Sequence, residues 1–85
     1  REIGWLTLPP GASIGEHKHT DNEDVYIIVS GKGVFTDSTG KQTQVGAGDI
    51  TIARPGQSHA LKNIGKEPLV FLDLIAETAA AQAAK

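Results

Sequence analysis

The sequence lacks cysteine, a long apolar run and any cluster of basic residues, and each absence narrows the possible functions. Without cysteine there is no disulfide and no thiolate metal site, so a bound metal would need histidine and carboxylate ligands. No apolar run approaches the ~20 residues of a membrane span, and no signal-peptide pattern is visible. The 8 lysines and arginines are scattered singly in a chain of net charge −2. We therefore expect neither a membrane nor a nucleic acid as a partner.

The missing cysteine is compatible with a reducing cytoplasm, where we expect the protein to reside. The chain begins with Arg1 rather than Met, which leaves room for residues upstream. Its 85 residues correspond to one small domain, and a domain of this size buries only about 60–65% of its unfolded surface. A bound metal or oligomerisation would supply the missing stability.

Short β-prone runs separated by glycine, proline, asparagine and aspartate dominate the sequence. This pattern predicts an all-β sandwich or barrel in residues 1–77, because strands recur about every 8–12 residues. The Ala-rich tail, residues 78–85, is the one segment that favours a helix, and it would be marginal alone. We expect strands at residues 3–8, 13–19, 24–29, 33–36, 43–45, 49–53, 58–63 and 69–75.

Two of these strands are apolar on both faces. Tyr26 and Ile28 share one face, while Val25 and Ile27 share the other, and residues 69–75 repeat the pattern. A sheet with one solvated face would instead alternate apolar and polar residues. We therefore expect a partner subunit to cover the outer face, most simply in a homodimer. Trp5 is expected in the core or in that interface.

The stretch "GEHKHTDNED" contains a candidate metal site. His17 and His19 are two residues apart on a predicted strand, so their side chains lie on the same side and Lys18 points away. Imidazoles with this spacing can bind one ion at about 2.0–2.1 Å. A carboxylate from the next strand and His59 could complete the site.

Two spaced motifs extend this pattern, and together they resemble the cupin family. The first runs from Gly11 through His17, His19 and Asp24 to Gly31. The second runs from Gly48 through Pro55-Gly56 and His59 to Asn63, with Arg54 where the family usually has proline. The resemblance covers residues 11–63. It implies a double-stranded β-helix, or jelly-roll barrel, and one divalent metal ion (Mn, Fe, Zn or Ni) bound by His17, His19, Asp24 and His59.

The acidic ligand departs from the family pattern, which has glutamate. The spacing back from Gly31 selects Asp24, which would face inward together with Tyr26 and Ile28. Glu23 lies one residue earlier, and neighbouring strand residues face opposite sides. A local bulge would turn Glu23 inward instead. If neither acid reaches the ion, three histidines and water would hold it.

Other residues near the two motifs are candidates for a substrate pocket. Arg54 could pair with a substrate carboxylate, although a charged residue at a strand end is more often simply exposed. Asn63 is expected to hold backbone near the second turn. The remaining pocket candidates are Tyr26, Phe35, Gln57 and Phe71.

The predicted site indicates a metal-dependent enzyme acting on a small carboxylate or carbonyl compound, such as a keto acid or an open-chain sugar. A metal with an open coordination position polarises carbonyls, activates water or supports oxygen chemistry. The sequence also resembles small bacterial cupins described as oxalate-decarboxylase-like, which implies a decarboxylase, a dioxygenase or an isomerase. The alternative is a non-catalytic module that binds metal or a small ligand, of the sensor type.

Overall fold

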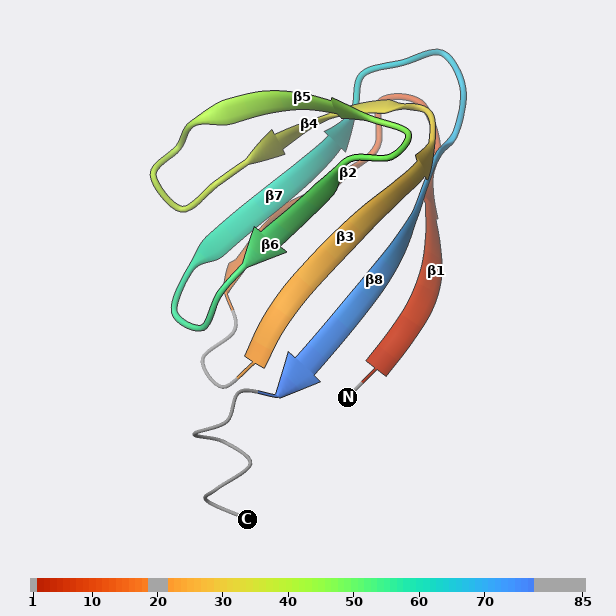
Figure 1. The fold of residues 1–85 in the computed structure, drawn as a ribbon. Coiled ribbons are helices and arrows are strands. Elements are labelled where there is room, and N and C mark those ends of the chain that lie inside the picture. Colours follow the sequence, from red (N-terminus) through yellow and green to blue (C-terminus); the bar gives the residue numbers. More distant parts are fainter. Residues whose placement is uncertain (1, 19–21, 78–85) are drawn as a thin grey trace.

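The computed structural model describes residues 2–18 and 22–77, and these residues form eight β-strands (Figure 1). Each strand lies within two residues of its predicted bounds, so the predicted strands are confirmed. His19 and the Ala-rich tail, residues 78–85, lie outside the described residues. The strands are β1 (Glu2–Leu8), β2 (Ser13–Lys18), β3 (Asn22–Ser30), β4 (Lys32–Thr36), β5 (Gln42–Gly46), β6 (Ile50–Ala53), β7 (Ser58–Asn63) and β8 (Leu69–Glu77).

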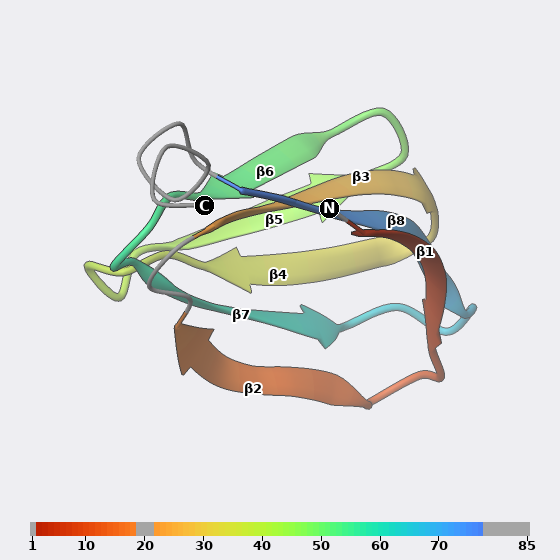
Figure 2. The ribbon, with the colours of Figure 1, turned by 90° about the horizontal axis from the view of Figure 1, so that it is seen from below.

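The strands form two four-stranded antiparallel sheets that face each other across a barrel (Figures 1 and 2). One sheet has the order β1-β8-β3-β6 and the other β2-β7-β4-β5, so strands far apart in sequence are neighbours in both. This interleaving confirms the predicted double-stranded β-helix. Within the described residues there is no helix long and apolar enough to cross a bilayer.

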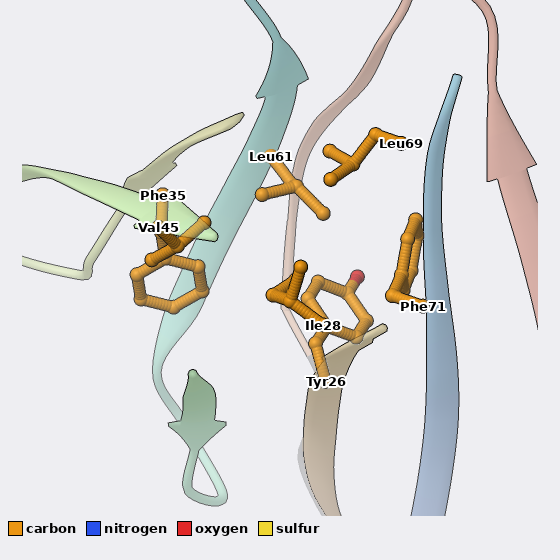
Figure 3. Packing of buried hydrophobic residues seen from close by; sticks show 7 residues of the cluster. All are labelled: Tyr26, Ile28, Phe35, Val45, Leu61, Leu69 and Phe71. Carbon is orange, nitrogen blue, oxygen red and sulfur yellow. The ribbon is translucent and has the colours of Figure 1, made fainter. Parts of the chain in front are cut away.

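The core lies between the sheets and is formed by large side chains from both (Figure 3). Alternation along the strands accounts for their position, since every second residue of a strand points to the same side. Leu8 and Ile14 pack against the edge of this cluster. Its buried members are Tyr26, Ile28, Phe35, Val45, Leu61, Leu69 and Phe71.

A tight turn at Gly31 carries the chain from the first sheet into the second. Gly31 has a φ of 93°, a backbone conformation that residues with a side chain rarely adopt. A Cβ here would also lie 2.6 Å from the carbonyl oxygen of Pro68. Only glycine therefore fits the crossing between β3 and β4.

Asn63 closes the barrel end at which β3 and β7 terminate. Its side-chain amide donates hydrogen bonds to the carbonyl oxygens of Leu8 and Glu67, at 2.8 and 2.9 Å, and its Oδ1 accepts one from the Gly65 amide at 2.9 Å. One buried side chain thus joins the end of β1, the end of β7 and the loop before β8. This confirms the structural role predicted for Asn63.

Candidate functional site

The site lies at the opposite end of the barrel, where β3 and β7 start (Figure 1). His59, the second residue of β7, is one of its residues. The strand β7 directs it inward, and its side chain is only 1% exposed. The Tyr26 ring stacks on the imidazole with centroids 5.0 Å apart, and Phe35 meets it edge-on at 5.8 Å. These contacts from both sheets fix the plane of the imidazole.

Asp24 enters the same space from β3. Its Oδ2 lies 3.1 Å from His59 Nε2, and its side chain is also 1% exposed. Tyr26 donates a hydrogen bond to this carboxylate. Burial raises the pKa of Tyr26 well above its usual range, and the charges of Asp24 and Asp73 raise it further. The phenol therefore stays protonated and remains a donor.

A β-bulge in β2 sets His17 opposite His59 in the backbone pairing of β2 with β7. Ile14 pairs with Leu61, and His17 then pairs with His59, so three steps along β2 match two along β7. Without the extra residue, Glu16 would occupy the position opposite His59. The sequence suggested a bulge only at Glu23 in β3, and the bulge in β2 was not predicted. His19 lies outside the described residues.

The two candidate acids occupy different positions. Pairing of β3 with β8 is regular through Glu23 and Asp24, so no bulge turns Glu23 inward. Glu23 lies at the rim, where its Oε2 is 4.0 Å from Nε of Arg54, and both side chains are exposed. The structure therefore places Asp24 inside with Tyr26, as the alternation predicted. The role of Asp24 as a metal ligand stays a prediction.

A cavity of about 250 Å³ opens beside His59, and three of the predicted pocket residues, Phe35, Arg54 and Gln57, line it. Gln57 also stabilises the Pro-Gly turn, because its Oε1 accepts a hydrogen bond from the Arg54 amide at 2.9 Å. The other two candidates, Tyr26 and Phe71, belong to the core, with ring centroids 4.9 Å apart. Tyr26 contacts Asp24 and His59 but does not belong to the lining of the cavity.

Asp73 is a second inward-facing acid, which was not among the predicted site residues. It lies on β8 directly opposite Tyr26, and its charge contributes to the raised pKa of that residue. It shares the inward side of β8 with Phe71 and Ile75, because residues two apart on a strand face the same way. Asp73 could have been identified from the sequence, because it is an acid at an inward position of a strand, β8, that is otherwise apolar there.

Asp24 and His59 form a direct ion pair whose atoms are also spaced as two ligands of one metal ion would be. Two ligand atoms that each lie about 2.1 Å from one ion, at an angle of about 90°, are about 3.0 Å apart. The observed 3.1 Å agrees with this value. A buried imidazole beside a carboxylate is also a donor set that divalent transition metals prefer. The described residues alone do not bring three such side chains together, and His19 is not among them.

Comparisons with known proteins agree with this architecture. A family model described as "Cupin domain" matches residues 4–75. A Thermotoga maritima protein named oxalate-binding protein is 43% identical over 75 residues, which cover 88% of this chain and 61% of that protein. A gentisate 1,2-dioxygenase from a Ralstonia species is 34% identical over 73 residues, covering 86% of this chain and 20% of the enzyme. The chain thus spans less than two thirds of either curated relative.

Among solved structures, this chain is similar to a crystal structure from Thermotoga maritima described as a predicted oxalate decarboxylase. The two superpose with a TM-score of 0.88 at 40% sequence identity. The match covers 92% of this chain and 67% of that one.

Proposed function

This chain belongs to the cupin family, and on that premise we propose that it binds one divalent metal ion and acts on a small carboxylate or carbonyl compound. The observation that carries the proposal is the buried pair of His59 and Asp24, whose ligand atoms are 3.1 Å apart. Two ionisable groups are costly to bury even as a pair, and a metal ion bound between them would offset that cost.

The proposed ligands are His17, His19, Asp24 and His59, and the ion is Mn, Fe, Zn or Ni. The pairing of His17 with His59 across the bulge supports the inclusion of His17. When bound, such an ion polarises a carbonyl or carboxylate of the substrate and stabilises developing negative charge.

Tyr26 is proposed to orient two ligands at once. It donates a hydrogen bond to Asp24 and stacks on His59, so it restrains both groups before any ion arrives. Groups that orient metal ligands in this way typically change affinity by about 10–100-fold when they are removed.

The cavity beside His59 has room for a small ligand, and its lining includes the guanidinium of Arg54 and the carboxylate of Asp37. Its volume of about 250 Å³ lies below the range of roughly 300–1,000 Å³ that drug-sized ligands occupy. Arg54 lies in its lining and is held only weakly by Glu23 at 4.0 Å, so its guanidinium is available to a substrate carboxylate. Oxalate, which the name of one relative mentions, is a compound of this size and charge.

A second inward acid supports an enzyme. Asp24 is committed to the proposed metal site, whereas Asp73 lies two residue pairs further along β3 and β8, opposite Tyr26. A carboxyl group that is not a ligand could move a proton to or from the bound compound. The second candidate function, binding without turnover, is favoured by the relative named as an oxalate-binding protein.

The test is to load the purified protein with each of the four metals and to measure oxalate binding by calorimetry and oxalate consumption by assay. Binding with turnover supports the enzyme, and binding without turnover supports the binding module. Arg54→Ala should weaken oxalate binding while leaving metal affinity unchanged, and the exposed Lys62→Ala serves as the charge-matched control. Failure to bind any of the metals would overturn the proposal.

A further inference from the structure

The cavity beside His59 is bordered by two turns that offer different hydrogen-bonding groups. Arg54 and Gln57 belong to the turn between β6 and β7, whereas Asp37 and Thr39 belong to the turn between β4 and β5. The few polar groups of a small cavity decide which ligand it accepts and in which orientation. The two turns together therefore indicate the class of compound that binds.

The turn between β6 and β7 provides hydrogen-bond donors. A guanidinium group such as that of Arg54 has only N–H donors and no acceptor. The Oε1 atom of Gln57 already accepts a hydrogen bond from the Arg54 amide at 2.9 Å, so the other end of this side chain is an NH₂ donor. This turn is thus suited to a ligand group that accepts, such as a carboxylate or a carbonyl.

The turn between β4 and β5 provides acceptors. Oδ1 of Asp37 accepts hydrogen bonds from the Thr39 hydroxyl at 2.6 Å, from the Thr39 amide at 2.9 Å and from the Lys41 amide at 3.0 Å. None of these bonds uses Oδ2. The hydrogen bond from the Thr39 side chain lowers the pKa of Asp37, so this group is an ionised carboxylate that can only accept.

The Thr39 hydroxyl strengthens this difference between the two turns. It donates its hydrogen to Asp37 and can therefore only accept from a ligand. Ser38 and Ser58 also line the cavity, but a free hydroxyl donates as well as it accepts and so favours neither kind of ligand group. The turn between β4 and β5 is thus suited to a ligand group that carries an O–H or N–H.

The opposite charges of the two turns do not form an ion pair with each other. In the part of the chain that the structure describes, Arg54 lies 4.0 Å from Glu23 and is not paired with Asp37. A dianion that reached both turns would place one of its carboxylates against the Asp37 carboxylate, with no hydrogen between them. A ligand with one carboxylate and one donor would satisfy both turns.

We propose that the cavity selects a small carboxylic acid that also carries a hydroxyl or ammonium group, that is, a hydroxy acid or an amino acid. This inference rests on the proposed function and narrows the class of compound that binds there. The carboxylate binds to Arg54 and Gln57, and the O–H or N–H group donates to Asp37. Phe35 lines the same cavity and offers an apolar surface to the carbon atoms of the ligand.

Glycolate and oxalate form the test pair, because glycolate has a hydroxymethyl group where oxalate has its second carboxylate. Calorimetry measures the affinity of the zinc-loaded protein for each compound. The two compounds differ in how strongly they chelate a metal in solution, so the informative quantity is the change in their affinity ratio between protein variants.

Asp37→Asn keeps one oxygen for the bonds from Thr39 and Lys41 and replaces the other by an NH₂ donor. The affinity for glycolate relative to oxalate should fall by about 10-fold or more, because glycolate loses an acceptor and oxalate gains a donor. Glu67→Gln is the matched control, since it removes the same charge from an exposed residue in the loop before β8, and it should leave the ratio unchanged.

Asp37→Ser is a second variant, which keeps a side-chain oxygen for the turn and removes the carboxylate. It should lower the ratio in the same direction, and it serves if Asp37→Asn does not fold. An unchanged ratio in the folded variants would overturn the proposed selection and leave the proposed function intact. An equal change in Glu67→Gln would assign the effect to net charge and also overturn the selection. A zinc-loaded wild type that binds neither compound would overturn both.

Discussion

The two ends of the barrel both bury polar side chains, but they use them in opposite ways. At the end where β3 and β7 terminate, Asn63 makes hydrogen bonds to three backbone groups of its own chain. At the end where these strands begin, Asp24 and His59 approach each other at 3.1 Å, and a cavity opens beside His59. At the first end, amide and carbonyl groups hold strand ends and a loop together, whereas at the second end two ionisable groups lie side by side.

This difference suggests that one end of β3 and β7 serves the stability of the fold and the other end serves its function. An amide that is satisfied by backbone stabilises the fold and has no capacity left for a ligand. A carboxylate held against an imidazole is poorly suited to a stable core and well suited to a metal ion. Changes at the Asn63 end should therefore affect unfolding, and changes at the Asp24 end should affect metal binding.

The largest effect is expected for Gly31→Ala, at the Asn63 end. The positive φ costs about 1–2 kcal/mol for a residue with a side chain, and the contact of the new Cβ with Pro68 adds about 1–3 kcal/mol. Gly40→Ala is the matched control, since Gly40 has a φ of 86° but open space around its Cβ position. Urea unfolding measures both, and equal losses would show that the contact with Pro68 has no effect.

Asn63→Ala should lower the free energy of unfolding by about 2–4 kcal/mol, because it leaves buried backbone groups without their partners. The neighbouring Lys62→Ala, at an exposed position, should change it little. Metal affinity measured on the folded Asn63→Ala variant should equal that of the wild type. A clear loss of affinity there would mean that the two ends are coupled.

Removal of metal should lower the melting temperature without unfolding the barrel. An ion that binds only the folded state stabilises it by about 2.7 kcal/mol at 100 times its dissociation constant. Melting curves with and without excess chelator measure this difference, and elemental analysis verifies the loss of metal. Identical curves would argue against any contribution of metal to stability.

Asp24→Ala should weaken metal binding by about 10–100-fold, by analogy with the loss of groups that orient metal ligands. Glu23→Ala should have little effect, since Glu23 lies at the rim beside Arg54. Metal titration of both variants distinguishes the acids. Wild-type affinity in both would leave a site of histidines and water.

The smallest effect is expected for Tyr26→Phe. This change removes the hydrogen bond to Asp24 but keeps the ring that stacks on His59. We expect a loss of metal affinity of about 10-fold, the lower end for orienting groups. If affinity is unchanged while the unfolding free energy falls, Tyr26 serves the core alone.

Most of the fold could be predicted from the sequence because alternation and turn residues are local signals. The same alternation placed Asp24 on the side of Tyr26. The bulge in β2 could not be predicted, since it exists only in the pairing of His17 with His59 on a strand about forty residues away. Trp5 was expected in the core or an interface, and its exposure in the single chain excludes the core.

The position of β8 between β1 and β3 has a consequence for synthesis on the ribosome. The last of the described strands to be made is an interior strand of its sheet, so β1 and β3 cannot be joined until translation has passed residue 77. Pairings between such distant segments form slowly. Throughout that time the growing chain presents the apolar residues of β3 without their neighbours on β8, in a form that is prone to aggregation. Slower elongation would lengthen this vulnerable period, whereas dilution of the newly made chains would make it less harmful.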